Sequence, residues 1–332
     1  MRRFFTSARI VSVVVLLFAC PFVWSQSFVA TPLSDLGTGK YKSFEGGLYE
    51  KGGNTVPAEH HADGLALASQ IKPIRGKFVF LGIGMSNAMI EFETFLRLAN
   101  GSDRVNHDSM VMLNGALGAM TACAWAPAKE TPRQHDCKMP GFLPNQYDRV
   151  RDEVLKPAGV SEDQVEAIWV LNADPRPDAA LPSHNAEAYE YERYLADTVR
   201  AARARYPNLK LMFISSRVYA GYAATPLNPE PYAYEYGFSV KWAIQAQIDQ
   251  MRDGKVDPTA GDLDYRKGTA PWIAWGPYMW ADGGIARSDG LTWQRSDFGD
   301  DGTHPNVQGR QKVAHLLMDF FLNSPYTEWF KK

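Results

Sequence analysis

The chain has 332 residues and a nearly balanced charge, with 35 lysines and arginines against 37 aspartates and glutamates. Charged residues make up 22% and hydrophobic residues 45%, the ordinary mix of a folded soluble protein. No run of like charge and no low-complexity repeat stands out, which argues against a nucleic-acid partner and against a fibrous or disordered class. The length is sufficient for one large core.

The first 25 residues are typical of a secretory leader. Two arginines open the segment, residues 10–20 form a short apolar stretch, and residues 23–25 offer a cleavage site before Gln26. The apolar stretch is shorter than the roughly 20 residues that a membrane span needs. A lipoprotein-like cut before Cys20 is an alternative that the following Pro21 disfavours. We expect an exported protein, periplasmic or secreted, with no membrane span once the leader is removed.

Beyond residue 70, apolar runs alternate with amphipathic stretches, whereas residues 26–70 lack this pattern and are interpreted as an irregular N-terminal wrap. Residues 71–332 are then one domain. Helices are expected around residues 89–99, 187–205 and 313–321, and strands over residues 77–83, 109–113, 165–171, 209–214 and 271–275. Strands that are apolar throughout and separated by helices indicate an α/β fold, a sheet of about five parallel strands covered on both faces. Functional side chains belong at the carboxyl ends of such strands.

Two cysteines remain after the leader, Cys123 and Cys137, in a polar segment that contains prolines. In an exported protein this pair predicts a disulfide that closes a surface loop. Such a bridge contributes about 3 kcal/mol if it is unstrained. The alternative is two free, buried thiols.

Three residues have the chemistry of an acyl-transfer site. Ser86 follows the first strand of the domain, and Asp301 and His304 stand three residues apart directly before the last helix. A serine hydroxyl needs an imidazole to accept its proton, and that imidazole needs a carboxylate on its other nitrogen. Each residue also has an ordinary structural role, Ser86 as a helix cap and Asp301 as a turn residue.

In Gly84-Met85-Ser86, in Gly115 and in the Asp301 to His304 block, the chain resembles the SGNH/GDSL hydrolase family over about residues 77–322. The resemblance implies a three-layer α/β/α, flavodoxin-like fold and ester hydrolysis without a metal or other cofactor. It implies Ser86 as nucleophile, His304 as base and Asp301 as its orienting acid. The backbone N–H groups of Ser86 and Gly115, completed by an asparagine, would form the oxyanion hole.

Two positions depart from the pattern of that family. Met85 stands directly before the serine, where the family normally has an acidic residue. The third block reads Asn172-Ala173-Asp174 in place of a glycine-asparagine-aspartate pattern. A carboxylate would repel an oxyanion, so Asn172 is the sensible third donor. The alternative is that Asn172 has no catalytic role and caps the following turn.

The stretch after the fourth strand is rich in aromatic residues. Tyr219 and Trp280 are candidate substrate contacts, because rings on loops suit stacking against sugars. The alternative is that such rings pack a lid onto the sheet. Arg217 is a candidate for an anionic substrate group, with a salt bridge to Glu230, Glu235 or Asp297 as its structural alternative.

Together these features predict an exported serine esterase that hydrolyses small acyl esters, with O-acetyl groups on carbohydrate as one candidate substrate. The alternative from another class is a glycan-binding protein on the same fold with weak or absent catalysis, motivated by Met85 and the irregular third block. A metal-dependent phosphoester hydrolase that uses Asp174, Asp301 and His304 lacks the usual ligand pairs.

Overall fold

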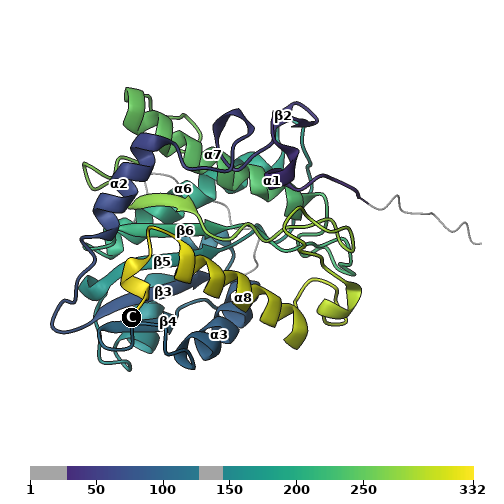
Figure 1. Cartoon of the computed structure of the whole chain (residues 1–332). Helices are drawn as coiled ribbons and strands as arrows, with labels where there is room; N and C mark the ends of the chain where they lie inside the picture. The colour runs from purple at the N-terminus through teal and green to yellow at the C-terminus, as the bar shows by residue number, and fades with distance from the viewer. Residues whose placement is uncertain (1–27, 127–144) are drawn as a thin grey trace, which may run out of the picture.

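The computed structural model describes residues 28–126 and 145–332. Its centre is a sheet of five parallel strands in the order β4-β3-β5-β6-β7 (Figure 1). The strands are β3 (Phe78–Gly84), β4 (Met110–Asn114), β5 (Val165–Leu171), β6 (Leu211–Ser215) and β7 (Trp272–Trp275). By position along the chain this is the order 2-1-3-4-5 of flavodoxin-like folds. The predicted α/β class with a five-stranded parallel sheet is confirmed.

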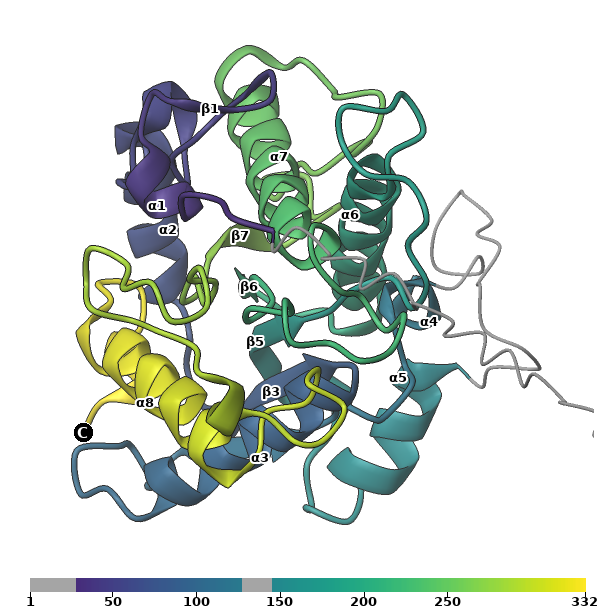
Figure 2. The ribbon, with the colours of Figure 1, turned by 90° about the vertical axis from the view of Figure 1, so that its right-hand side faces the viewer.

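Helices cover both faces of the sheet, which gives three layers (Figures 1 and 2). Helices α3 and α8 pack against each other on one side of the strands, and α6 and α7 pack against each other on the other side. The helices are α1 (Leu33–Leu36), α2 (Ala58–Ala68), α3 (Ser86–Asn100), α4 (Ala122–Trp125), α5 (Gln146–Arg149), α6 (Glu187–Arg205), α7 (Tyr232–Asp253) and α8 (Val307–Asn323). Two two-residue strands, β1 (Lys40–Tyr41) and β2 (Phe44–Glu45), form a small separate hairpin near the N-terminus.

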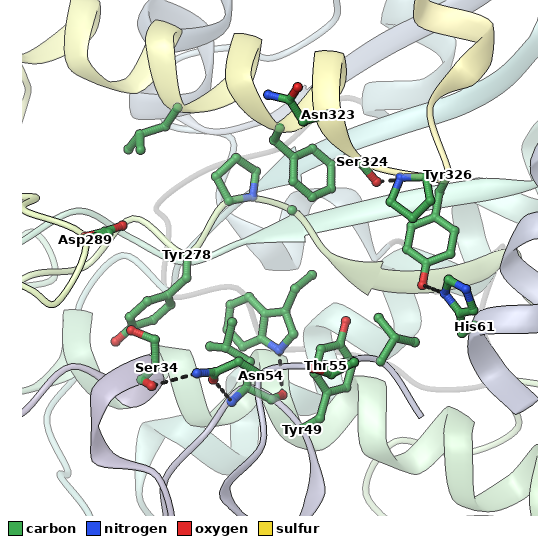
Figure 3. Close-up of a pocket in the computed structure, with 18 of the residues that line it drawn as sticks. Ser34, Tyr49, Asn54, Thr55, His61, Tyr278, Asp289, Asn323, Ser324 and Tyr326 are labelled. Carbon is green, nitrogen blue, oxygen red and sulfur yellow. Dashed lines mark hydrogen bonds between the residues drawn. The ribbon is translucent and has the colours of Figure 1, made fainter. Parts of the chain in front are cut away.

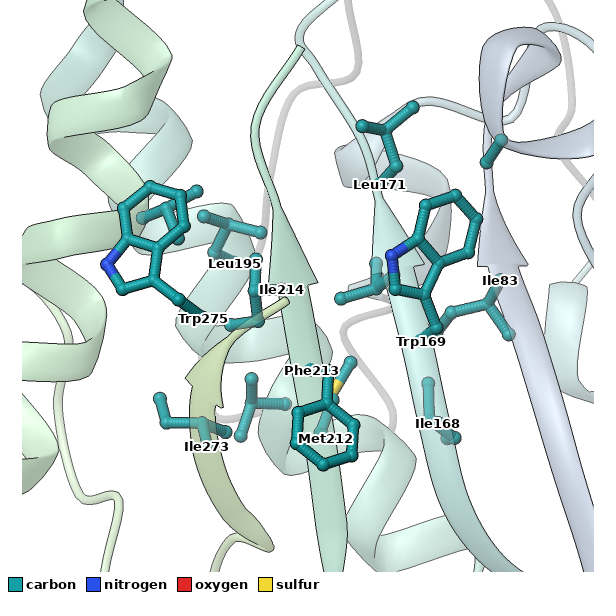
Figure 4. Packing of buried hydrophobic residues seen from close by; sticks show 14 of the residues in the cluster. Ile83, Ile168, Trp169, Leu171, Leu195, Met212, Phe213, Ile214, Ile273 and Trp275 are labelled. Atoms are coloured by element: carbon teal, nitrogen blue, oxygen red, sulfur yellow. The ribbon is translucent and has the colours of Figure 1, made fainter. Parts of the chain in front are cut away.

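The core forms because the central strands are apolar on both faces. All seven residues of β3 and of β5 are buried. Trp169 of β5 stacks on Phe92 of α3 with ring centroids 5.3 Å apart, and Phe213 of β6 contacts Phe321 of α8. Trp169 and Phe213 are register partners and project from the same side of the sheet (Figure 4). The aromatic residues of this layer fix α3 and α8 against the strands.

Most predicted elements lie within two residues of their observed bounds, and the helix expected over residues 187–205 is α6. Helix α7 is an element that the sequence pattern did not predict. It is buried along most of its length, so it has no continuous polar face and therefore no amphipathic stripe.

The expectation that residues 26–70 are irregular is wrong for α2. Pro57 stands at its N-cap, and the alanine-rich stretch that follows favours a helix. His60 is buried and stacks on Trp272, while its Nε2 contacts the Ile273 carbonyl at 2.9 Å. The helix thus carries a histidine of the core.

Two further predictions meet the limits of the described residues. The leader and Cys137 lie outside them, so the leader and the disulfide with the buried Cys123 stay predictions. Within residues 28–126 and 145–332, we find no helix that combines the length and the hydropathy required to cross a bilayer.

Candidate active site

The candidate site lies where the strand order reverses. Ser86 is the first residue of α3, directly after β3, and β3 pairs with β4 on one side and β5 on the other. In open α/β sheets, ligands bind at the carboxyl ends of strands at such a reversal. The loop that contains Asp301 and His304 returns to the same place, because α8, which follows it, packs against α3.

The structure brings Ser86, His304 and Asp301 together as expected. Ser86 Oγ lies 2.7 Å from His304 Nε2, and His304 Nδ1 lies 2.5 Å from Asp301 Oδ2. The other oxygen of Asp301 accepts the backbone N–H groups of Thr303 and His304, each at 3.0 Å. The carboxylate therefore fixes both the ring and the loop that carries it.

The charge of Asp301 is supported by the same contacts. Burial alone would raise the pKa of this carboxyl, but hydrogen bonds from the His304 ring and from two backbone N–H groups outweigh burial and hold the pKa below its usual value. The side chains of Asp301 and His304 are each about one-third exposed, at 33% and 30%. The pair is therefore open to water.

Two glycines make the positions of these residues possible. Gly84 has a φ of +140°, and a Cβ there would lie 2.0 Å from the Leu171 carbonyl oxygen at the end of β5. Gly302 has a φ of +66°, and a Cβ there would lie 1.8 Å from the Tyr222 carbonyl oxygen. Both conformations favour glycine, and both sites leave no room for a side chain. The turn from Gly84 to Ser86 and the loop from Asp301 to His304, here called the histidine loop, thus depend on close approaches between backbone segments.

The turn from Gly84 to Ser86 is held by contacts that do not involve the Met85 side chain. The Trp125 indole N–H donates to the carbonyls of Gly84 and Met120 at 3.3 and 3.1 Å, and the Leu117 N–H donates to Gly84 at 3.1 Å. Met85 itself is buried and lines the cavity beside Ser86. An indole and an amide therefore hold the turn.

A cavity of about 250 Å³ opens beside Ser86 and His304. Besides Thr303 and His304 of the loop before α8, its walls come from the segments after β3, β4, β5 and β6. Sequence reasoning missed about half of the residues that line it, Ala119 and Asn228 among them. Both have positive φ, +66° and +55°, but only the Asn-Pro pair at 228 gave a sequence signal for a turn. The cavity is below the range of pockets for drug-sized ligands.

The Ser86 N–H is placed to serve an oxyanion, because the first N–H groups of a helix have no acceptor within the helix. The predicted role of Gly115 is not supported. Its N–H donates to the Gly82 carbonyl at 2.8 Å, Arg149 binds its carbonyl, and it does not line the cavity. Parallel pairing of β4 with β3 continues one residue past the strand and uses this group. Ala119 lines the cavity instead, and among the described residues its N–H has no acceptor.

The predicted third donor, Asn172, is not in the cavity either. Its Oδ1 accepts the Ala173 N–H at 2.9 Å, and its Nδ2 is buried with no hydrogen-bond partner in the described part of the chain. Ala173 and Asp174 line the cavity in its place. The amide bonds to the turn that follows it, which is the structural alternative that the sequence left open.

Arg217 does line the cavity, although it is only 2% exposed. None of the predicted salt bridges forms. Glu235 pairs with Lys42, and Asp297 pairs with Lys312. Burial lowers the pKa of the guanidinium, and the neighbouring acids, Glu91 first, oppose this effect.

The aromatic residues predicted to contact substrate are part of the core. Neither Tyr219 nor Trp280 lines the cavity, and their rings contact each other with centroids 6.0 Å apart. The Trp280 indole N–H donates to Glu230 at 2.7 Å. The packing alternative therefore describes both residues.

A larger groove of about 660 Å³ lies between the N-terminal segment, α8 and the loop after β7 (Figure 3). Trp275 and Tyr278 line it but are only 4% and 6% exposed. They therefore expose little surface for stacking on a sugar. No residue of the Ser86, His304 and Asp301 triad lines this groove.

One group of acidic residues could in principle hold a metal ion. Within the described residues, oxygens of Asp174, Glu187 and Glu190 lie within 4.8 Å of one another. Asp301 and His304 are not in this group. The ligand set of the phosphoester hydrolase, the option that the sequence disfavoured, is therefore not assembled around Asp174.

Comparisons with known proteins add little. No family model and no curated protein matches the chain. A solved protein from Streptococcus pneumonia, put forward as a platelet activating factor, is similar at 13% identity over 79% of this chain and 92% of that chain, with a TM-score of 0.36. A likeness this weak carries no argument about activity.

Proposed function

We propose that the chain is a serine esterase of the SGNH/GDSL kind that hydrolyses small acyl esters after export. One observation carries the proposal: the hydrogen-bonded series Ser86 Oγ, His304 and Asp301, at 2.7 and 2.5 Å, beside a cavity. Nucleophile, base and orienting acid within hydrogen-bond reach are the geometric signature of an activated serine.

The reaction follows from these contacts. His304 Nε2 accepts the Ser86 proton as Oγ attacks the ester carbonyl, and Asp301 stabilises the imidazolium through Nδ1. The imidazolium then protonates the leaving alkoxide, which leaves an acyl group on Ser86. Water enters through the partly exposed triad and attacks the acyl carbon while His304 takes its proton. The imidazolium then returns this proton to Ser86 Oγ as the bond from Oγ to the acyl carbon breaks, which releases the acid and restores the free serine.

The oxyanion of each tetrahedral intermediate would be stabilised at the start of α3. The Ser86 N–H is one donor, and the positive end of the 15-residue helix adds a favourable field. The Ala119 N–H is our candidate for the second donor. Loss of one such donor costs about 3 kcal/mol of transition-state stabilisation in other serine hydrolases.

The size of the cavity supports a short acyl group. About 250 Å³ is less than a drug-sized ligand requires. An O-acetyl group on a carbohydrate fits this limit, but the rings that suggested a sugar are buried. The buried rings therefore offer no stacking surface to a glycan-binding protein either.

Fluorophosphonate labelling with peptide mapping tests the proposal. We expect modification at Ser86 alone, and loss of both labelling and hydrolysis of 4-nitrophenyl acetate in Ser86→Ala. The exposed Ser69 provides the matched control, and Ser69→Ala should behave as wild type. Hydrolysis that persists in Ser86→Ala, with circular dichroism showing a folded protein, would overturn the assignment.

A further inference from the structure

We propose that the cavity beside Ser86 accepts an ester whose acyl or alcohol part carries a carboxylate, and that Arg217 binds this carboxylate. The inference rests on the proposed esterase function and adds the class of substrate. It also explains why a buried cation lines this cavity, since a cavity for a neutral acyl group needs no cation.

The first observation is the hydrogen-bonding state of the guanidinium. Nε and Nη2 of Arg217 are closed off from solvent and have no hydrogen-bond partner among the described residues. Nη1 likewise makes no hydrogen bond in that part of the chain, and it is not closed off. Since Arg217 lines the cavity, Nη1 is the nitrogen that the cavity presents.

The second observation is the lack of a compensating anion in contact. Within residues 28–126 and 145–332, no carboxylate forms an ion pair with Arg217 within 4.0 Å; Glu91 and Glu230 are the acids that interact with it electrostatically. The two oxygens of Glu230 accept N–H groups from Ala220, Tyr234 and Trp280. Burial raises the pKa of Glu91 to about 8, so this acid carries little charge near neutral pH, and it raises the pKa of Glu230 to about 7, so Glu230 is only partly ionised there.

A buried cation without acceptors is costly, and proteins normally pair it or hydrogen-bond it. The missing partner is therefore expected to arrive with the ligand. A carboxylate accepts charge-assisted hydrogen bonds from guanidinium, and these are stronger than neutral ones. An uncharged acyl chain would leave the cation unpaired.

The third observation is that the polar surroundings suit a polar ligand. Thr121, Asn228 and Thr303 also line the cavity, and each has a buried side-chain oxygen without a hydrogen-bond partner in the described chain. These three oxygens are closed off from solvent, and so are both carboxylate oxygens of Asp174, which lines the cavity as well. Of Asp174 and Arg217, only Arg217 has a charged atom that is not closed off.

The test compares matched esters by pH-stat. Monomethyl succinate against methyl pentanoate places the carboxylate in the acyl part, and O-acetyl-lactate against isopropyl acetate places it in the alcohol part. We expect wild type to prefer the charged ester in one of the two pairs. In Arg217→Met the ratio of kcat/KM for charged over neutral ester should fall about tenfold or more.

Two further variants complete the design. Arg217→Lys keeps the charge but not the planar fork, so its ratio should lie between wild type and Arg217→Met. Arg97→Met removes an exposed arginine of α3 and should leave the ratio unchanged. The melting temperature of Arg217→Met should not fall far, because the substitution removes an unpaired buried charge. If Arg217→Met does not fold, Arg217→Lys and the wild-type preference decide.

The outcomes separate this inference from the proposed function. Equal rates for charged and neutral esters in wild type overturn the inference and leave the esterase standing. An equal loss for both esters in Arg217→Met overturns it too, because Arg217 would then act on the oxyanion. If Ser86 is neither labelled nor active, the esterase fails. In that case, calorimetry with succinate tests the anion site by itself. Binding to wild type that is lost in Arg217→Met would support the site, and absence of binding to wild type would overturn it.

Discussion

Gly302 offers a sharp test of how the histidine loop is held. It stands between Asp301 and Thr303 with a φ of +66°, and a Cβ there would lie 1.8 Å from the Tyr222 carbonyl oxygen. Real Cβ atoms essentially never approach within 3.0 Å. In Gly302→Ala the two segments must therefore separate by about 1.2 Å, the difference between 3.0 and 1.8 Å. The left-handed backbone itself costs alanine about 1–2 kcal/mol.

The segment that contains Tyr222 cannot simply move away from residue 302. The Ala224 N–H donates to the Asp301 carbonyl at 2.8 Å. The segment around Tyr222 that meets Gly302 is therefore hydrogen-bonded to the residue that orients His304. A misplacement of about 1 Å in a catalytic group can lower the rate about 100-fold. We expect Gly302→Ala to lower kcat by about that factor, with a smaller effect on KM.

Gly290→Ala is the matched control. Gly290 has a φ of +87° and is exposed, and a Cβ added there would meet no other atom within 4 Å. It should lose stability for the same backbone reason and keep full activity. Hydrolysis of 4-nitrophenyl acetate and thermal unfolding by circular dichroism measure the two effects. Wild-type kcat in Gly302→Ala, with a stability loss no larger than in Gly290→Ala, would refute the reasoning.

Three further predictions concern the triad, its support and pH. Asp301→Asn should lower kcat about 10³- to 10⁴-fold with KM little changed in steady-state assays, because an amide N–H facing Nδ1 of His304 favours the wrong tautomer. Trp125→Phe should cost about 1–2 kcal/mol in denaturant unfolding and slow hydrolysis moderately, because the Gly84 and Met120 carbonyls lose their indole donor; unchanged unfolding and rate would contradict that support. Burial raises the pKa of Glu192 from 4.5 to about 8, so the folded state holds its proton longer than the unfolded state and stability falls as pH rises through this window. Glu192→Gln should abolish this contribution, at most about 5 kcal/mol, and equal pH slopes for both proteins would contradict it.

The sheet and the triad could be predicted because their signals are local. Strands buried on both faces are continuous apolar runs, and residues directly after them must meet at one edge of the sheet. The pair Asp301 and His304 needs only three residues of spacing. Its approach to Ser86 followed from the position of the last helix, and the structure has that contact at 2.7 Å.

The remaining parts of the site depend on contacts that a sequence pattern does not carry. The Asn-Gly pair at 114–115 stands at the end of β4, but one more backbone bond to β3 uses the Gly115 N–H. Asn172 had the right chemistry and bonded to its own turn. Arg217 is buried near Glu91 of α3, Tyr191 of α6 and Tyr236 of α7, and α7 has no amphipathic pattern. Tertiary packing decided each of these positions.

The separation of the triad along the chain has a consequence for biosynthesis. Ser86 and His304 are 218 residues apart, and their contact requires α8 to dock on α3. A nascent chain therefore contains the proposed nucleophile long before it contains its base. The serine stays unreactive until the C-terminal helix has been made and has folded back. Phosphonate labelling would accordingly report the completion of folding, and Ser86 would not be labelled in a chain truncated before α8.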